Sequence, residues 1–361
     1  MPWMPVPLAK VAQNNLFRFY TDGGDWVLIL SNGLTEKVDE GFLKVASSLI
    51  KRIKKAKPDT VVVSYDRKTD ISDHHLNLNK LLLNKELFSL LRKEKQEVLY
   101  IPFPAKALST ALRIFILSLF SKPRVKVILV MRTPFDFASR LLLNLSRAEI
   151  IVFSKASADF YKNILSKKRV TYLKTGVDTE KFIPVSEEKQ RHLKEKYNIS
   201  PEKKVILHVG HLKVGRNIDE LTKLDSKYQI LLVVSQQFEN EKDTDLRQRL
   251  ESKENIKILD SYIPEIEEVY QLADVYFFPV KDEGNCIDVP LSCLEAAACN
   301  KPVVTTDYGE MKEFLDKEGF YFIDAADSKT LNSLIEIATN KTALPRDAVI
   351  EYNWDNALKF F

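Results

Sequence analysis

Short runs of apolar, mostly β-branched residues alternate along this chain with segments whose apolar positions recur every three or four residues. The runs are apolar at nearly every position, as in parallel strands covered on both faces. In the C-terminal half, strands are expected at 205–210, 229–235, 255–259, 274–280, 302–306 and 320–323. Helices are expected at 217–224, 243–251, 263–273, 291–298, 310–316 and 328–338. Regular alternation of this kind predicts a doubly wound parallel sheet.

The N-terminal half repeats this rhythm less regularly. Strands are expected there at 25–30, 60–65, 98–101, 125–131, 149–154 and 169–173. A linker at 174–202, which contains a charged helix, would join an N-terminal domain (1–185) to a C-terminal domain (186–345). Two such α/β domains form a cleft at the carboxyl ends of their strands, where ligands bind. We expect a final helix, 346–361, to pack back on the first domain.

Composition narrows the functional classes. The chain has 361 residues, 45% of them hydrophobic, which is enough for two cores, and a net charge of +4 is too small for a dedicated nucleic-acid binder. Three cysteines argue against a disulfide framework and for a reducing compartment. No signal peptide is evident, and no apolar stretch reaches the ~20 residues that a membrane span needs. We therefore expect a cytoplasmic protein, and this expectation is compatible with peripheral membrane contact. The composition does not indicate the oligomeric state.

One segment could provide that membrane contact. Residues 105–126 combine an apolar helical face with several lysines and arginines. An interfacial helix of this composition can dock on anionic lipid. A domain helix with one buried face and solvated ends is the more common explanation, and both interpretations remain open.

The most informative segment is FFPVKDEGNCIDVPLSCLEAAACNKPVVTTDYG, residues 277–309. A buried strand leads into an acidic loop that contains glycine, and Pro290 suits the first position of the helix that follows. The start of such a helix offers unpaired N–H groups and the positive end of the helix dipole. The segment therefore predicts a site for a diphosphate.

Glu295 lies in that helix on the side of the apolar residues Leu291, Leu294 and Ala298. A carboxylate on an apolar face is costly to bury without a partner. The hydroxyls of a ribose would provide one; a structural role in capping a neighbouring loop would provide another. The residues alone favour neither.

A second candidate site is VILHVGHLKVGRN, residues 205–217. Gly210 ends a strand, and His211, Lys213 and Arg216 follow on the loop that enters a helix. Loop backbone together with cations is a common way to hold phosphates, although most basic loops are simply solvated.

Three motifs in this order resemble those of the retaining family 4 glycosyltransferases, which have the GT-B fold. TGVDTEKFIP (175–184) resembles the family's interdomain signature, VGHLKVGRN (209–217) its phosphate loop, and 273–313 its donor loop. The resemblance covers roughly residues 125 to 320. It implies two Rossmann-like doubly wound domains that face each other across a cleft.

The resemblance also implies a function. Such an enzyme moves a sugar from a nucleotide-diphosphate sugar, a UDP- or GDP-sugar, to a glycan, lipid-linked or other acceptor, with retention of configuration. It requires no metal or other cofactor. Arg216 and His211 match the positions that contact the donor diphosphate, and Lys213 can supply charge beside them.

The remaining donor positions follow from the same motifs. Glu295 matches the acid that holds the ribose, and Glu283 or Asp288 the acid near the transferred sugar. Positions for the base, the phosphates and the loop between them are Tyr262, Ile263, Gly284, Asn285, Val289, Pro290, Leu291 and Ser292.

The acceptor side departs from the family pattern. Residues 1–20 align best with the family's first helix, so its first strand and Gly-Gly loop are expected to be missing. A histidine common in the family is replaced by the segment from Arg132 to Asp136. Acceptor candidates are Asp66, His74, His75, Arg132 and Asp136, although a polar surface loop or metal binding would also suit the first three.

These departures leave two other hypotheses. One is a nucleotide-sugar epimerase or hydrolase on the same fold. The other is a catalytically silent nucleotide-sugar binder or partner subunit.

Overall fold

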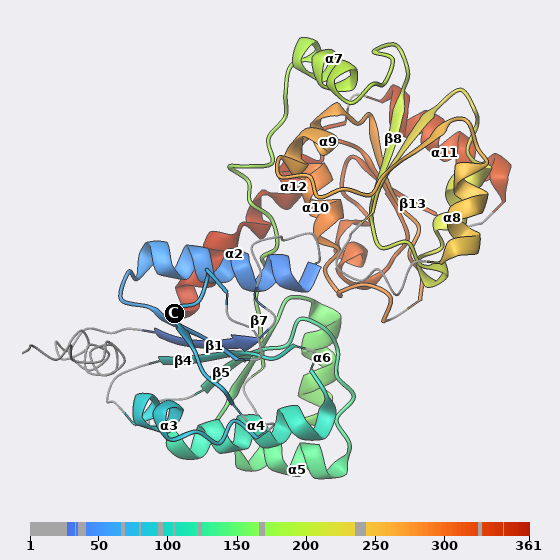
Figure 1. Ribbon diagram of the computed structural model, residues 1–361. Helices are drawn as coiled ribbons and strands as arrows, with labels where there is room; N and C mark the ends of the chain where they lie inside the picture. Colours follow the sequence, from blue (N-terminus) through green and yellow to red (C-terminus); the bar gives the residue numbers. More distant parts are fainter. Residues whose placement is uncertain are drawn as a thin grey trace, which may run out of the picture.

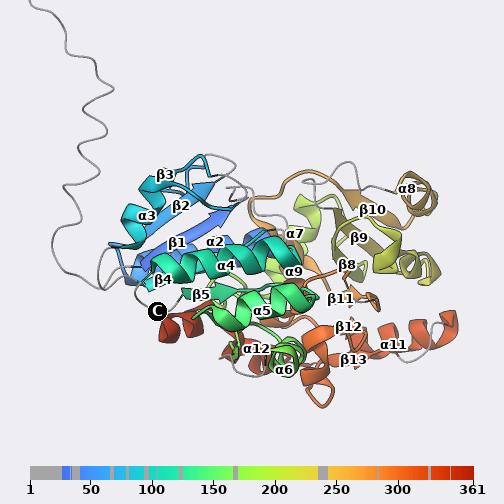
Figure 2. The ribbon, with the colours of Figure 1, turned by 90° about the horizontal axis from the view of Figure 1, so that it is seen from below.

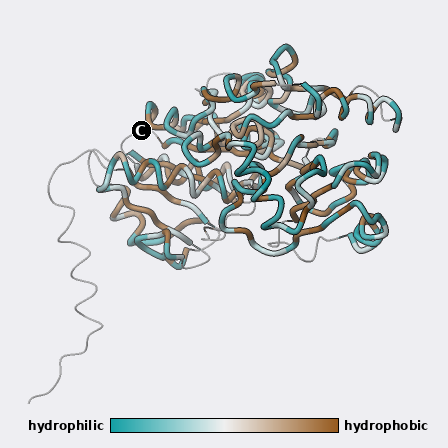
Figure 3. The backbone as a smooth tube through the Cα atoms, turned by 90° about the horizontal axis from the view of Figure 1, so that it is seen from above, coloured by the Kyte–Doolittle hydropathy of each residue, from teal (hydrophilic) through white to brown (hydrophobic). Residues whose placement is uncertain are grey.

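The computed structural model describes two α/β domains side by side, with helix α2 (Gly41–Ala56) between them (Figure 1). The described residues are 27–32, 34, 41–65, 69–78, 81–92, 97–103, 105–121, 125–165, 170–234, 243–282, 284–323, 327–341 and 343–361. Hydrophobic positions concentrate in the interior of both domains and hydrophilic ones along the outer loops and helix faces (Figure 3).

The N-terminal domain is built on a parallel sheet whose described strands have the order β3-β2-β1-β4-β5-β6-β7. These strands are β1 (Val27–Asn32), β2 (Val61–Tyr65), β3 (His74–His75), β4 (Glu97–Ile101), β5 (Val125–Ile128), β6 (Glu149–Val152) and β7 (Val170–Tyr172). Its helices besides α2 are α3 (Lys85–Leu91), α4 (Ala107–Phe120), α5 (Phe137–Leu145) and α6 (Lys155–Ile164).

Alternate residues of β1 point to opposite faces of this sheet, as the pleat of a strand requires. Val27 and Ile29 belong to the core beneath α2, whereas Leu28 and Leu30 belong to the core beneath α4. Figure 1 shows the result: α2 covers one face of the sheet, and α3, α4 and α5 lie on the other.

The C-terminal domain repeats the arrangement with the order β10-β9-β8-β11-β12-β13, again all parallel. Its strands are β8 (Val205–Gly210), β9 (Gln229–Val234), β10 (Ile256–Leu259), β11 (Val275–Phe278), β12 (Val303–Thr305) and β13 (Phe320–Phe322). Its helices are α7 (Glu187–Lys196), α8 (Thr244–Glu251), α9 (Ile266–Leu272), α10 (Leu291–Ala298) and α11 (Ser328–Asn340), with 3₁₀ turns η1 (Val214–Arg216), η2 (Ile218–Lys223) and η4 (Gly309–Phe314). The predicted two-domain α/β architecture is confirmed.

The last segment returns to the N-terminal domain. It runs through α12 (Arg346–Val349), η5 (Ile350–Tyr352) and η6 (Trp354–Phe360) rather than one continuous helix. Trp354 and Ala357 join the core beneath α2. The backbone of Val177, in the linker, accepts from Trp354 N (3.2 Å) and donates to Tyr352 O (3.0 Å).

The position expected to lack a strand is occupied. β1 lies between β2 and β4, where the first strand of a doubly wound sheet belongs, and α2 is the next described helix after it. The expected helix in residues 1–20 lies outside the described residues. Among the described residues, a helix that packs on β1 is α2, which follows this strand in the sequence.

Within the described parts of the chain, no helix is both long and apolar enough to cross a membrane.

Candidate active site

A pocket of about 380 Å³ lies between α2 and the C-terminal domain. The C-terminal domain contributes Gly210, Tyr262, Ile263, Leu291 and Glu295, all of which were predicted to bind the donor. The opposite wall comes from α2, through Lys44, Ser47, Ser48, Lys51 and Arg52, and from the linker, through Asp178, Lys181 and Phe182. The sequence reasoning found the first wall but not the second.

Glu295 is buried at this pocket, with 5% of its surface exposed. Lys44 Nζ lies 3.0 and 2.9 Å from its two carboxylate oxygens, and the Tyr270 hydroxyl donates to Oε2 at 2.7 Å. Burial, and next the charge of Glu295, raises the pKa of Tyr270 far above its usual value, so that hydroxyl remains a donor. A carboxylate accepts about four hydrogen bonds, so Glu295 retains capacity for a ligand.

Lys44 was not among the predicted site residues. It lies 251 positions before Glu295 and on the other domain. The buried carboxylate itself was the available signal, because an acid on an apolar helix face implies a partner. The sequence could not say which of the chain's lysines and arginines supplies it.

Arg216 borders the same pocket through Gly210. A Cβ at Gly210 would lie only 2.6 Å from Arg216 Nη1, so glycine is what lets the guanidinium lie across the end of β8. Arg216 is 9% exposed, and among the described residues its buried Nε has no hydrogen-bond partner. An unpaired N–H of a buried guanidinium is costly, and an anionic ligand would relieve that cost.

His208 lies beside Arg216 and was missed by the sequence reasoning. It is fully buried, and its Nδ1 lies 2.8 Å from Phe277 O. Burial, with the charge of Arg216 adding to it, lowers the pKa of His208 to about 4, although the bond to Phe277 O opposes this shift. A neutral imidazole that donates from Nδ1 leaves Nε2 as an acceptor. The Nε2 atom of His208 lies towards Gly210, because a Cβ added to that glycine would be 3.1 Å from it.

Helix α10 begins at the same pocket. Pro290 is its N-cap and Leu291, its first residue, lines the pocket together with Gly210. Gly176 of the linker packs on this end of the helix, with φ +153°, and a Cβ there would lie 2.9 Å from a methyl of Leu294. The structure thus brings the first turn of α10 and the Arg216 loop to one pocket.

Asp288 is buried just before α10, where the two domains meet. Arg132 Nε donates to its Oδ2 at 3.1 Å, Ser154 Oγ at 3.3 Å, and Ser157 Oγ also donates to it. A Cβ at Gly309, whose φ is +55°, would collide with Asp288 O, and Glu310 N donates to that oxygen at 2.8 Å. A predicted sugar-side acid and a predicted acceptor-side cation are therefore in contact.

The donor loop and the phosphate loop also touch. The Asn285 side chain lies against Gly215, where a Cβ would collide with it, and exposed Gly284 has φ +87°. Val289 is buried, Ser292 is half-buried, and Lys213 and His211 are half-buried in the loop before η1. Glu283 lies outside the described residues.

The other acceptor-side candidates do not converge. His74 and His75 form β3 at one edge of the sheet, where His75 Nδ1 lies 3.3 Å from Ser64 Oγ. Asp136 is the N-cap of α5, and its hydrogen bonds to Ser139 lower its pKa. Asp66 lies outside the described residues. Among those residues, no group of three or more His, Cys, Asp or Glu side chains could hold a metal ion.

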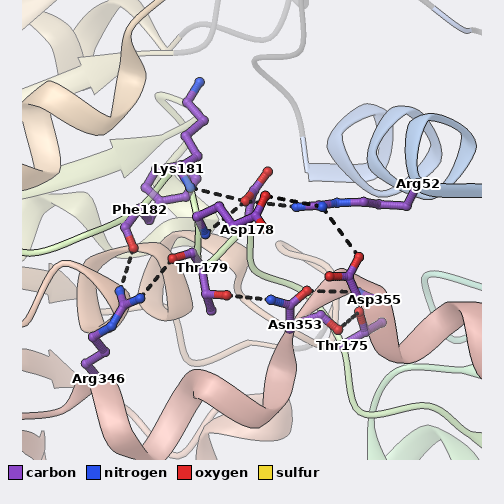
Figure 4. Close-up of polar contacts among 10 residues, drawn as sticks. Arg52, Thr175, Asp178, Thr179, Lys181, Phe182, Arg346, Asn353 and Asp355 are labelled. Atoms are coloured by element: carbon purple, nitrogen blue, oxygen red, sulfur yellow. Dashed lines mark hydrogen bonds and ion pairs between the residues drawn. The ribbon is translucent and has the colours of Figure 1, made fainter. Parts of the chain in front are cut away.

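A polar network joins the linker to both domains near the pocket (Figure 4). Arg52 of α2 forms ion pairs with Asp178 at 3.1 Å and with Asp355 at 3.4 Å. Arg346 donates to the carbonyl oxygens of Phe182 (2.7 Å) and Thr179 (2.8 Å). The network fixes the linker that forms one side of the pocket.

Comparison with known proteins identifies the second domain. Residues 189–353 match the family model described as glycosyl transferases group 1. The second domain is thus similar to the glycosyl transferases group 1 domain. It contains Gly210, Arg216, Asp288 and Glu295, whereas Lys44 and Arg132 come from the domain before it.

A curated relative and several solved structures are similar to the chain. The alpha-galactosylglucosyldiacylglycerol synthase of Streptococcus pneumoniae is 25% identical over 187 residues, which are 50% of this chain and 48% of that protein. The match thus spans about half the length of the curated relative. A glycosyltransferase structure from Rickettsia africae has a TM-score of 0.73 at 14% identity, covering 93% of this chain and 97% of its own.

Anabaena HepE in complex with UDP has a TM-score of 0.67 at 16% identity, covering 92% of this chain and 94% of its own. These likenesses extend over both domains and confirm the predicted GT-B fold around the glycosyl transferases group 1 domain.

Proposed function

We propose that this chain is a glycosyltransferase that moves a sugar from a UDP- or GDP-sugar to an acceptor, with retention of configuration and without a metal ion. The observation that carries the proposal is the pocket beside α10, which is lined by Gly210, Tyr262, Ile263 and Glu295 and is bordered by Arg216. The glycosyl transferases group 1 domain supports it.

The pocket offers a place for each part of a nucleotide. Main-chain groups of Tyr262 and Ile263 would hold the base, and Glu295 would accept hydrogen bonds from the ribose hydroxyls. The diphosphate would then lie between the first turn of α10 and Arg216, whose buried Nε needs an acceptor.

Departure of the nucleoside diphosphate is the step these groups would assist. Negative charge grows on the phosphate oxygens as the bond to the sugar breaks, and Arg216, Lys213 and the α10 dipole would stabilise it. The acceptor hydroxyl would attack from the same side and pass its proton to the departing diphosphate, which retains the configuration.

The contact between Arg132 and Asp288 would form the sugar side. Asp288 or Glu283 would bind sugar hydroxyls, and Arg132 keeps the buried Asp288 paired until the donor enters. The acceptor is proposed to be a glycan or a lipid-linked sugar, because the relative from Streptococcus pneumoniae is named as a glycolipid synthase. We propose a cytoplasmic location.

Two measurements test this function. Calorimetric titration with UDP and GDP should show saturable binding of one of them, unchanged by EDTA. Incubation with the corresponding nucleotide sugars and a membrane extract should then give a glycosylated product whose anomeric configuration, read by NMR, matches that of the donor.

Failure of both nucleotides to bind would refute the assignment of the pocket. Binding without turnover would favour the silent binder, and release of free or epimerised sugar would favour the hydrolase or epimerase.

A further inference from the structure

Helices α4 and α5 expose an unusual amount of apolar surface. Exposed fractions are 51% for Leu108 and 64% for Leu119 on α4, and 83%, 52% and 62% for Phe137, Leu141 and Leu145 on α5. These five side chains are called the α4–α5 face below. Figure 2, which views the molecule from below, shows both helices side by side in front of the N-terminal sheet.

The face is not needed to hold the helices on the domain. The inner side of α4 already buries Ala111, Ile114 and Leu117, and α5 buries Leu143. Phe137, Leu141 and Leu145 repeat every four residues, so they form a second stripe along the outside of α5. Single exposed leucines are ordinary, whereas a stripe next to further leucines on a neighbouring helix indicates a contact surface.

Two helices of the other domain, α7 and α8, show the contrast. Every leucine of α7 and α8, which are Leu193, Leu246 and Leu250, is buried, and the other residues of these two helices are polar or charged. Outward apolar residues are thus not a general property of helices in this chain.

Charge indicates what covers the face. Residues 105–148 contain eight lysines and arginines and one acid, Asp136. Lys106 is exposed at the start of α4, and Arg140 and Arg147 are exposed along α5 and just after it. Apolar side chains flanked by cations suit an anionic bilayer, in which the apolar groups enter the acyl boundary and the cations meet the headgroups.

The face also begins next to the proposed sugar site. Phe137 is the first residue of α5, and Arg132, five positions earlier, donates to Asp288. Met131, beside Arg132, is 37% exposed. A membrane that covers the face would therefore lie close to Arg132 and the proposed sugar side.

We propose that the α4–α5 face binds the surface of an anionic lipid bilayer and so brings the region around Arg132 close to membrane-bound molecules. The second clause rests on the proposed function, whereas the membrane contact does not. The proposed contact extends beyond the expected segment 105–126, because it includes α5 as well as the outer leucines of α4.

Flotation of the full chain with vesicles tests the proposal. Vesicles of equimolar phosphatidylcholine and phosphatidylglycerol should carry the protein, vesicles of phosphatidylcholine alone should carry much less, and high salt should weaken the binding. The variant Phe137→Ser/Leu141→Ser/Leu145→Ser should bind the anionic vesicles at least about tenfold more weakly. Lys106→Gln/Arg147→Gln should lower the preference for the anionic vesicles.

A matched control is available elsewhere on the surface. Leu315→Ser/Leu344→Ser/Ile350→Ser removes three side chains that are 54%, 54% and 49% exposed and should bind vesicles like the wild type. Circular dichroism and the affinity for UDP should be the same in all variants, which separates this test from that of the pocket.

Wild-type protein that ignores anionic vesicles, or an α5 variant that binds them as well as the wild type, would overturn the proposal. A wild-type dimer that the α5 variant breaks, with vesicle binding unaffected, would assign the face to a second copy of the chain instead.

Discussion

Replacing Glu295 by glutamine tests the nucleotide site most directly. The amide keeps the size of the side chain and an oxygen that can accept from Tyr270, so the fully buried tyrosine keeps a partner. Alanine would leave that hydroxyl unpaired and cost stability, which would confuse the result. What glutamine removes is the negative charge that Lys44 and, by proposal, two ribose hydroxyls share.

The size of the effect follows from the hydrogen bonds. A bond to a charged acceptor contributes about 1.5–3 kcal/mol, and a neutral one about 0.5–1.5 kcal/mol. Two ribose hydroxyls that lose charge assistance should together cost about 2 kcal/mol, which is roughly a 30-fold rise in the Kd for UDP. Lys44, with 17% of its side chain exposed, can turn to solvent.

Calorimetry should measure the Kd of UDP, 2′-deoxy-UDP and 3′-deoxy-UDP for both the wild type and Glu295→Gln. These values form a thermodynamic cycle between the side chain and each ribose hydroxyl. Removing a hydroxyl should weaken binding to the wild type more than to Glu295→Gln, with a coupling of about 1 kcal/mol for at least one hydroxyl. Lys44→Gln is the matched control: it breaks the same ion pair but should preserve the hydroxyl effect. Equal losses on removing each hydroxyl in wild type and Glu295→Gln would refute the ribose role.

Two further predictions concern the residues around Gly210. Arg216→Ala should reduce turnover by about 10²- to 10³-fold while raising the KM for the donor much less, because the charge of Arg216 matters most as the diphosphate departs. Steady-state kinetics checks this prediction. A rise in KM as large as the fall in turnover would instead show that Arg216 binds the donor mainly in the ground state. His208 has a folded pKa of about 4 against 6.5 when unfolded, so the unfolded chain takes up a proton first as the pH falls. The folded protein should then lose about 2 kcal/mol of stability between about pH 7 and pH 5 through this residue. Urea unfolding of His208→Asn, which keeps a donor for Phe277 O, should lack that part of the slope, and an unchanged slope would contradict the shift.

The strand pattern was predictable because buried parallel strands leave runs of apolar residues. The twelve expected strands correspond to β1, β2 and β4 to β13. β3 was not expected, since two residues, His74 and His75, cannot show a pattern. The expected helices at 217–224 and 310–316 are instead 3₁₀ turns, η2 and η4, where short segments follow the local packing.

The candidate site was predictable where a local motif carries it. Gly210, Arg216 and Glu295 were predicted as site residues because each belongs to a short, continuous motif. Gly210 and Arg216 lie in the basic loop of 205–217, and Glu295 lies in the helix of 277–309. Lys44 and His208 were not predicted, for two different reasons. Lys44 pairs with Glu295, which belongs to the other domain. The pKa of His208 is lowered by complete burial next to Arg216, and its position in an apolar strand does not reveal that neighbour.

The C-terminal segment has a mechanical consequence. Because the chain passes from the first domain to the second near Val177 and comes back near Asn353, two neighbouring connections hold the halves together. A pair of adjacent tethers permits rotation about the line through them and resists sliding or twisting. Opening for nucleotide exchange should therefore be a rotation about these two connections, and it would have to break the ion pairs Lys44–Glu295 and Arg132–Asp288 that join the domains.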